Sequence, residues 1–378
     1  MDVLISGASM AGLSAAYWFA RLRHRVTVVE RTDGLRPGGA PIDVRGRALG
    51  TAERMGILAT IDEEKVSILD PMPVLDSTGT QVATLDLRWF ANETDEDIEI
   101  TRDRLNRILL SVIPDGVDFR FKTSIASLAD GTDGVDVAFT DGRQGHYDLV
   151  VGADGLHSNV RKLAFGPEED YVRHFGYYVS LVDLPNDREW QRGMLSVPGL
   201  AIAVRDAGDG PQGMMLAASA ELDYDYRNLD DQRRLIRHFL SRVDAWQVPA
   251  LRAAFTDPAA KGFYFDSVSQ THMPRWINGH AAVIGDAGHC AALLSGMGTT
   301  LAMVSAELLA TTWTEHDGNA ERASPTYHER LRPYVEQCQA FALEGAPIMV
   351  PLTQEALDER NATFRTYAAK FANEPTAG

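Results

Sequence analysis

The spacing of apolar residues changes twice within the first thirty positions. Val3–Ile5 form a short apolar run that predicts a buried strand, and Val26–Val29 predict a second one. Between them, apolar residues recur at helical spacing, at Leu13, Ala16, Tyr17 and Ala20. A strand, a helix and a second strand in this order predict a parallel βαβ unit.

Two later apolar runs end in junctions of the same kind. Residues 147–153 lead into an Asp-Gly pair at 154–155, and residues 281–284 lead into a Gly-Asp pair at 285–286. A glycine-rich turn follows the second pair, and the pattern predicts a helix from Thr299 onward. Because open α/β sheets bind ligands beyond the carboxyl ends of their strands, all three junctions are candidate ligand contacts.

Two other stretches, 69–100 and 168–275, alternate between apolar and polar positions, which predicts a separate and largely antiparallel sheet. Their large apolar side chains are Trp89, Phe90, Tyr177, Tyr178, Met214, Met215, Phe263 and Phe265. After residue 320 the pattern becomes helical, and we expect Pro347 and Pro351 to break it before a last helix that runs through residue 373.

The order of these stretches predicts an α/β protein with interleaved domains. We expect residues 1–68, 101–167 and 276–345 to form the first domain. The second domain would comprise 69–100 and 168–275, and a helical segment would follow at 346–378.

Charge and cysteine content narrow the possible partners. The chain holds 53 Asp and Glu against 36 Lys and Arg, a formal net charge of −17. Such a chain is repelled by phosphate backbones and anionic lipid surfaces, so we expect neither nucleic acid nor a membrane as a partner. Cys290 and Cys338 belong to no disulfide or zinc-ligand pattern, which predicts that no metal is bound.

The apolar N-terminal stretch Val3–Ala20 is not typical of a signal peptide. Asp2 replaces the expected basic start, the stretch contains a glycine turn, and basic residues follow it where a cleavage site would stand. No other apolar run is as long as a membrane span. A cytoplasmic location is therefore the expectation.

The turn after the first strand has the composition of a dinucleotide-binding turn. From Gly7 to Gly12 it keeps small residues where backbone N–H groups must approach a pyrophosphate at a helix N-terminus. Ser9 replaces the middle glycine of the usual pattern, and its hydroxyl would bond a phosphate. Glu30 ends the second strand, where a carboxylate accepts hydrogen bonds from an adenosine ribose. The turn predicts a nucleotide and leaves NAD and FAD open.

The two later junctions favour FAD, because a nucleotide of that length needs further anchors for its ribityl chain and flavin ring. Asp286 stands where a carboxylate would accept a ribityl hydroxyl. The turn Gly296-Met297-Gly298 opens a helix whose N-terminal N–H groups would stabilise negative charge on a reduced flavin.

The three junctions together resemble the fingerprints of the single-component FAD-dependent monooxygenases of the para-hydroxybenzoate hydroxylase type. That family includes tetracycline-modifying monooxygenases and polyketide hydroxylases. The segments that resemble its GxGxxG, DG and GD motifs are 7–12, GADGLHSNVR (152–161) and GDAGH with the following GMG (285–298). The chain departs from the family at Leu293, where proline is usual, and at Thr300, where asparagine is frequent.

The resemblance implies a set of binding residues. Those expected to bind the cofactor are Gly7, Ser9, Met10, Ala11, Gly12, Glu30, Arg31, Arg45, Arg102, Asp154, Gly285, Asp286, Gly296, Met297, Gly298, Thr299 and Thr300. Those expected to line a substrate pocket are Leu293, Tyr178, Met215 and Phe265. No catalytic side chain is expected, because in this chemistry the flavin carries the reaction.

The resemblance also implies a fold and an activity. The fold would be a Rossmann-like, glutathione-reductase-like FAD-binding domain interleaved with an antiparallel-sheet substrate domain, with helices at the C-terminus. The activity would be hydroxylation of a small aromatic or polyketide-like substrate through a flavin C4a-hydroperoxide, with NADPH or NADH and O2 as co-substrates, as in antibiotic biosynthesis or modification.

Three alternatives stay open at this level. They are a Baeyer–Villiger or epoxidising relative, a non-oxygenating FAD oxidoreductase, and a catalytically silent flavin- or drug-binding protein. A flavin-dependent halogenase is disfavoured, because the chain contains no WxWxIP-like segment.

Overall fold

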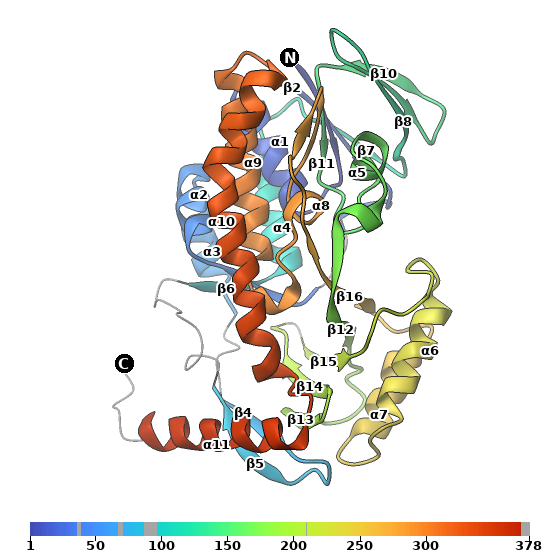
Figure 1. Cartoon of the computed structure of the whole chain (residues 1–378), viewed down its shortest axis with the longest axis vertical. Coiled ribbons are helices and arrows are strands. Elements are labelled where there is room, and N and C mark those ends of the chain that lie inside the picture. Colours follow the sequence, from blue (N-terminus) through green and yellow to red (C-terminus); the bar gives the residue numbers. More distant parts are fainter. Residues whose placement is uncertain (36–38, 67–70, 87–96, 209, 372–378) are drawn as a thin grey trace. The chain divides into compact units, whose positions relative to one another are not determined.

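The chain forms two compact units whose segments alternate along the sequence. The computed structural model describes residues 1–35, 39–66, 71–86, 97–208 and 210–371 (Figure 1). Unit 1 comprises Met1–Lys65, Ile100–Arg173 and Ser269–Ala342, and unit 2 comprises Val66–Glu99, His174–Val268 and Leu343–Gly378. Trp89 and Phe90, two of the aromatic residues noted in the sequence, lie outside the described residues.

A six-stranded sheet in the order β17-β18-β11-β1-β2-β7 forms the centre of unit 1 (Figure 1). Ser6 pairs with Gly152, and Gly152 pairs with Val283, so β1, β11 and β18 end level with one another. These strands are apolar on both faces, as expected for a parallel sheet that helices cover on each side. The parallel strands are β1 (Asp2–Ser6), β2 (Arg25–Glu30), β7 (Asp118–Phe121), β11 (Leu149–Gly152) and β18 (Ala281–Val283), and β17 (Ile277–Asn278) is antiparallel.

The helices of unit 1 pack on one another as well as on the sheet. α1 (Met10–Arg21) packs against α9 (Gly298–Glu315) and α4 (Arg102–Ser111). Glu307 on α9 accepts hydrogen bonds from Thr51 Oγ1 at 2.6 Å and Arg54 Nε at 2.5 Å, which ties α2 to α9. The remaining elements are α2 (Arg47–Met55), α3 (Leu58–Glu63), α5 (Asn159–Ala164), α8 (Asp286–His289), the strand pair β3 (Pro41–Val44) and β6 (Ile98–Thr101), and the antiparallel β8 (Ile125–Asp130), β9 (Val135–Phe139) and β10 (Gln144–Tyr147).

One expected helix end is wrong. α10 (Ala320–Met349) continues through Pro347, and α11 (Gln354–Phe371) follows after Pro351. A proline inside a helix loses one backbone hydrogen bond, but α10 also runs through Pro333, so a proline does not by itself end this helix. Pro351 does separate the two helices as predicted.

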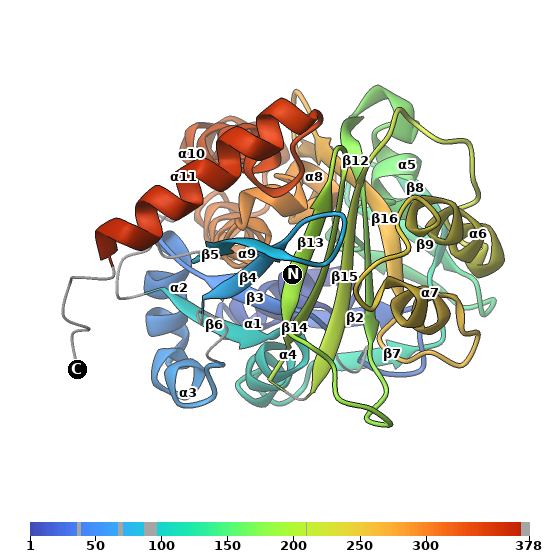
Figure 2. The same cartoon turned by 90° about the horizontal axis from the view of Figure 1, so that it is seen from below.

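The sheet of unit 2 is largely antiparallel and has the order β16-β12-β15-β14-β13-β4-β5, as the alternating pattern predicts. Helices α6 and α7 lie side by side against one of its faces (Figures 1 and 2). α11 packs on β5 and β13, so the C-terminal stretch belongs to this unit. The elements are β4 (Met72–Leu75), β5 (Gln81–Leu85), β12 (Val172–Asp183), β13 (Gly193–Val197), β14 (Leu200–Asp206), β15 (Pro211–Ala218), β16 (Tyr264–Thr271), α6 (Leu229–Leu240) and α7 (Val248–Thr256).

Strand register assigns each residue of this sheet to one of two faces. The pairs Tyr178–Ala217 and Ile202–Met215 lie on the face that α6 and α7 cover, where they join the hydrophobic core. Neighbouring residues in each strand point the other way. We call this opposite side the second sheet face; its residues include Tyr177, Val179, Leu181, Ala201, Ala203, Met214 and Leu216.

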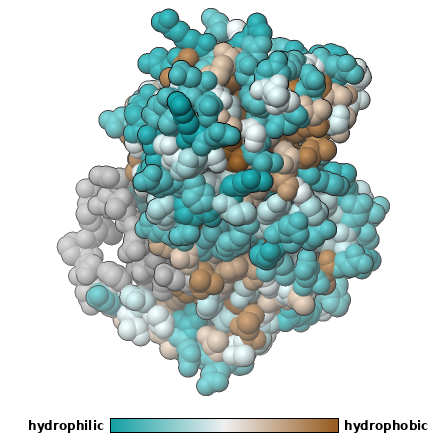
Figure 3. All heavy atoms as spheres, turned by 45° about the horizontal axis from the view of Figure 1, so that its top comes forward, coloured by the Kyte–Doolittle hydropathy of each residue, from teal (hydrophilic) through white to brown (hydrophobic). Residues whose placement is uncertain are grey.

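The face of the molecule seen in Figure 3 is largely hydrophilic. Its hydrophobic residues are scattered among the hydrophilic ones. Among the helices that the structure describes, none combines the length and apolar character that crossing a bilayer requires.

Candidate functional site

Three neighbouring strand ends converge in unit 1. Gly7, Asp154 and Gly285 follow β1, β11 and β18, which are adjacent and end level. A Cβ on Gly7 would lie 2.4 Å from the carbonyl oxygen of Ala153, and a Cβ on Gly285 would lie 3.0 Å from the Cβ of Ala11. The three junctions that the sequence singled out therefore meet at one edge of the sheet.

The first turn of α1 begins at this edge with no side chain over its N-terminus. Ser9 is the N-cap residue, but its hydroxyl makes no capping bond, and the first turn holds no acidic residue. Gly12 allows the tight approach, because a Cβ there would lie 1.9 Å from the carbonyl oxygen of Gly7. The backbone N–H groups and the positive end of the helix dipole are thus available to an anionic group.

Glu30 lies beside this turn at the end of β2. Its Oε2 accepts the backbone N–H of Ala8 at 3.0 Å, and its Oε1 accepts the N–H and the hydroxyl of Thr32 at 3.0 and 2.9 Å. These bonds fix the orientation of the carboxylate, and its oxygens retain lone pairs that a ribose hydroxyl can use.

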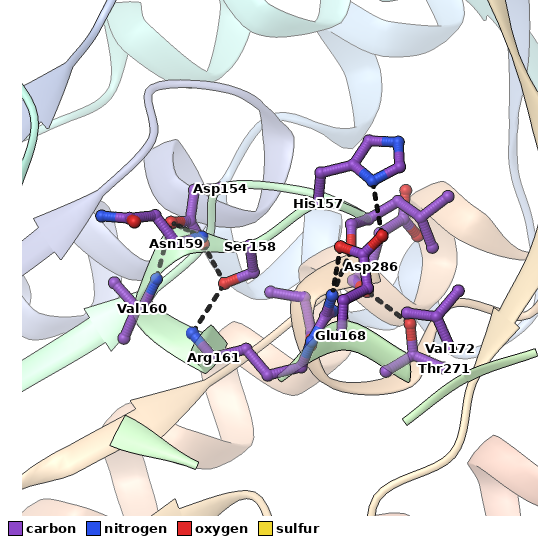
Figure 4. Close-up of polar contacts among 12 residues, drawn as sticks. Asp154, His157, Ser158, Asn159, Val160, Arg161, Glu168, Val172, Thr271 and Asp286 are labelled. Atoms are coloured by element: carbon purple, nitrogen blue, oxygen red, sulfur yellow. Dashed lines mark hydrogen bonds and ion pairs between the residues drawn. The ribbon is translucent and has the colours of Figure 1, made fainter. Parts of the chain in front are cut away.

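Asp154 turns inward and organises the neighbouring loop (Figure 4). It accepts hydrogen bonds from Ser158 Oγ at 2.5 Å and from the backbone N–H groups of Asn159 and Val160 at 3.0 and 3.1 Å. Burial raises the pKa of this carboxyl, and the bond from Ser158 opposes that shift. In this structure Asp154 therefore caps α5 and holds the DG segment in place.

An ion-pair network joins the DG segment to the GD segment (Figure 4). The buried Arg161 donates to the carbonyl oxygen of Ala287 at 3.0 Å and to Glu168 at 2.9 Å, and Glu168 is also 2.8 Å from Nδ1 of His157. Burial opposes ionisation of Glu168, but the bond and charge of His157 and the charge of Arg161 hold its pKa below its usual value. Arg161 thus braces two separate segments of the site.

The GD turn exposes its carboxylate at the same sheet edge. Gly285 has φ +56°, a conformation that favours glycine, and the Asp286 side chain after it is exposed. Thr271 Oγ1 donates to the backbone carbonyl of Asp286 at 2.9 Å, which anchors the turn from β16 (Figure 4).

The glycine turn before α9 packs on the segment after β3. Arg45 pairs with Asp43 at 2.8 Å, and its carbonyl accepts the Thr300 hydroxyl at 3.1 Å. A Cβ on Gly296, which has φ +64°, would lie 3.2 Å from Asp43 Oδ2. A Cβ on Gly298 would meet no heavy atom within 4 Å, so the first residue of α9 faces open space. The neighbouring side chains are buried, at Met297, Thr299 and Thr300.

The other expected residues of unit 1 lie around these turns. Arg102 starts α4 and packs over Gly39, where a Cβ would lie 2.8 Å from Arg102 Nε. Arg31 is exposed just after β2, and the Leu293 side chain is 52% exposed in the turn before Gly296.

The structure corrects the expected pocket residues of unit 2. Tyr178, Met215 and Phe265 are 1%, 0% and 4% exposed and lie in the core between the sheet and α6 and α7. Tyr178 stacks on Phe265 with ring centroids 5.6 Å apart, and its hydroxyl accepts the backbone N–H of Leu222. Because these side chains lie on the helix-covered face, they stabilise the unit and do not line a pocket.

Several partners of the site residues were not visible in the sequence. Thr32 orients Glu30, Asp43 pairs with Arg45, and Gly39 makes room for Arg102. Thr32 stands two residues after Glu30, a spacing at which a threonine commonly bonds back to a carboxylate, so a local signal existed. Asp43 and Gly39 are brought to their partners by tertiary packing and gave no such signal.

The residues present fit FAD. An uncapped helix N-terminus at Met10 suits a pyrophosphate, the oriented carboxylate of Glu30 suits a ribose, and the open space at Gly298 lies at a second helix N-terminus. Each group is a donor or acceptor type that one end of this dinucleotide requires.

Fold and site define a flavoprotein oxidoreductase, and the relatives agree. A family model described as an FAD binding domain matches residues 1–188. A flavin-dependent monooxygenase of Legionella longbeachae is 32% identical over 96% of this chain and 93% of the relative. An uncharacterized protein of Mycobacterium tuberculosis is 36% identical over 94% of this chain and 96% of the relative. The crystal structure of the tetracycline destructase Tet(51) has a TM-score of 0.83 at 29% identity, covering 100% of this chain and 99% of that one.

The chain therefore belongs to the flavin-dependent monooxygenases. The predicted fold class, the predicted enzyme class and the choice of FAD as cofactor are confirmed.

His289 ends the GD segment in an apolar environment. Its side chain is 0% exposed, it meets Trp276 edge-on with ring centroids 5.4 Å apart, and neither ring nitrogen has a hydrogen-bond partner among the described residues. Burial lowers its pKa to about 3. The ring is neutral at physiological pH and packs against Trp276, which does not suit a proton-transfer role.

His289 makes the stability of the fold depend on pH. In the unfolded chain a histidine binds a proton below about pH 6.5, whereas the folded protein excludes that proton until the pH nears 3. Stability should therefore fall as the pH drops below about 6.5, and the drop between pH 7 and pH 5 should be about 2 kcal/mol smaller in His289→Leu. Chemical denaturation at both pH values measures this difference, and equal drops in the two proteins would contradict it.

Proposed function

We propose that this monooxygenase uses NADH or NADPH and O2 to hydroxylate a small aromatic or polyketide-like molecule. The observation that carries the proposal is the meeting of three strand-end turns beside two uncovered helix N-termini, at α1 and α9. When bound, FAD supplies the redox chemistry, because it accepts a hydride and activates O2 for transfer of one oxygen atom. We also propose a cytoplasmic location, where reduced nicotinamide nucleotides are supplied.

In this proposal the chain binds and orients both ends of the cofactor. The N–H groups of the first turn of α1 hold the pyrophosphate, and Glu30 accepts the adenosine ribose hydroxyls. Asp286 accepts a ribityl hydroxyl. The first N–H groups of α9, at Gly298 and Thr299, stabilise negative charge at the flavin ring.

We propose that the second sheet face contacts the substrate. Its half-buried apolar side chains are Leu181 and Met214, which lie next to the small, buried Ala203. A mixture of large and small apolar residues suits a flat ring system and keeps water from the reacting carbon. The similarity to a tetracycline destructase supports a fused-ring, polyketide-like substrate.

Oxygen labelling tests the function directly. Purified holo-enzyme should oxidise NADH or NADPH faster when a phenol or polyketide of the right shape is added, and the product should gain one oxygen atom. With ¹⁸O2 the label should enter the product, because the oxygen comes from the gas and not from water. Label arriving from H2¹⁸O, or dinucleotide oxidation that no tested compound stimulates, would contradict the proposal.

Gly298→Leu tests the place of the flavin ring. A Cβ at this position meets no heavy atom within 4 Å, and Gly298 is the first residue of α9, so we expect the apo-protein to keep its fold. The FAD dissociation constant should rise at least about tenfold, equivalent to about 1.4 kcal/mol, because the leucine occupies the cofactor's space. Fluorescence titration with FAD measures this change. Gly298→Ala is the control and should have a smaller effect, and wild-type affinity in the leucine variant would remove Gly298 from the site.

Two adjacent methionines test which sheet face meets the substrate. Met214 lies on the second sheet face and Met215 in the helix-covered core. Met215→Ala should lower the free energy of unfolding by about 2–5 kcal/mol and leave the KM for substrate unchanged. Met214→Ala should change the KM for substrate severalfold at a smaller cost in stability. If the two variants exchange these effects, the assignment of faces is wrong.

A further inference from the structure

A groove of about 370 Å³ opens on unit 1. Its walls are Phe165, Tyr171, Met273, Pro274 and Arg275. The Tyr171 hydroxyl donates to the carbonyl of Phe165 at 2.7 Å, and the Tyr171 carbonyl accepts the N–H of His272 at 2.8 Å, so the two sides of the groove are joined by hydrogen bonds. Two aromatic rings, apolar side chains and one guanidinium form a lining that suits a flat heterocycle carrying negative charge.

Two further arginines bond to the segments that form the groove. Arg332 donates to the carbonyl of Met273 at 2.6 Å, and Arg173 donates to the carbonyls of Glu169 and Asp170, both at 2.8 Å. Burial lowers the pKa of His272, and the positive charges of Arg173 and Arg332 lower it further.

These guanidinium groups keep their charge available. Across the described ranges of the chain, neither Arg173 nor Arg275 nor Arg332 forms an ion pair with a carboxylate; Arg173 and Arg332 bond to neutral carbonyls. The nearby Glu168 is already engaged by Arg161 and His157. Arg275 lines the groove, and Arg173 and Arg332 bond to residues beside it; in a chain with a net charge of −17, these guanidinium groups favour an anion at this place.

The groove is connected to the GD segment. Thr271, two residues before Met273, donates to the carbonyl of Asp286, and Trp276, just after Arg275, donates to the carbonyl of Gly288 at 2.8 Å. The segment that forms one wall of the groove is thus bonded at both ends to the turn that we assign to FAD.

We propose that this groove binds the adenosine-phosphate part of the nicotinamide dinucleotide that reduces the enzyme. The adenine stacks on Tyr171 and Phe165, and the phosphates bind Arg275 and Arg173. The inference rests on the proposed function and adds to it the place where the co-substrate is held. A dinucleotide with at least two phosphate charges fits this groove, whereas an uncharged aromatic substrate would leave the guanidinium groups unused.

Arg275→Ala in the FAD-loaded enzyme tests this site, with Arg107→Ala as the matched control. Arg107 is an exposed arginine of the same unit, on α4, and its side chain is 62% exposed. ADP-ribose, which cannot reduce the flavin, is the binding probe in calorimetric titrations. Its dissociation constant should rise about tenfold in Arg275→Ala and further in Arg275→Glu, and should stay at the wild-type value in Arg107→Ala. The KM for NADH and NADPH should rise in parallel, while FAD content and kcat at saturating dinucleotide stay unchanged.

The outcomes separate the groove from the proposed function. A larger rise in the KM for NADPH than for NADH would show that Arg275 binds the 2′-phosphate, and equal rises would show that it binds the pyrophosphate. Both results support binding of the dinucleotide in the groove. Wild-type affinity for ADP-ribose in the two Arg275 variants overturns it, even if the enzyme hydroxylates a substrate. Conversely, binding that depends on Arg275 in an enzyme that hydroxylates no compound would contradict the proposed function and leave the groove standing.

Discussion

The backbone contact at Gly7 is the constraint on which the rest of the site depends. A methyl group there would lie 2.4 Å from the carbonyl of Ala153, and one at Gly12 would lie 1.9 Å from the carbonyl of Gly7. No side chain can therefore stand at either position while β1, β11 and the start of α1 keep their places. This close approach brings the uncapped N-terminus of α1 to the sheet edge where the second and third strand ends lie. The glycines act by leaving room for neighbouring backbone, and the helix end supplies the donors.

The polar residues of the later two motifs have a largely mechanical task. Asp154 uses its carboxylate to cap α5, and Arg161 crosses from α5 to the carbonyl of Ala287 and to Glu168. The sequence led us to expect Asp154 at a cofactor or NAD(P)H contact, whereas its hydrogen bonds are made within the protein. The DG segment thus fixes the position of the GD turn. Asp286 itself is exposed in the turn after β18.

How much of this arrangement the sequence could predict depends on whether the signal is local. The strand-turn-helix at Gly7 and the two later strand ends were predictable, because apolar runs and the glycines after them lie together in the chain. The sheet face on which Met215 lies could not be predicted. It depends on which side of the sheet α6 and α7 cover, and tertiary packing decides that. The end of α10 was misplaced because a proline does not by itself end a helix that tertiary packing stabilises, and α10 runs through both Pro333 and Pro347. The stability prediction for His289 likewise needed the structure, since burial is the main cause that lowers its pKa.

Net charge and local chemistry act in opposite directions in this protein. A charge of −17 repels every anion at a distance, yet FAD is anionic, and so is the nicotinamide dinucleotide that we propose as co-substrate. The turn at Gly7 offers backbone N–H groups to an anion. Their partial positive charge acts at contact distance and does not change the net charge. Arg45 is already paired with Asp43, so little of the attraction there comes from arginine side chains. At the groove beside Arg275, where we propose that the nicotinamide dinucleotide binds, Arg173 and Arg332 bond to carbonyl oxygens and form no ion pair among the described residues. A cofactor that stays bound can rely on many neutral donors in fixed positions, whereas a co-substrate that must arrive and leave in every cycle gains more from charge that attracts it from solution.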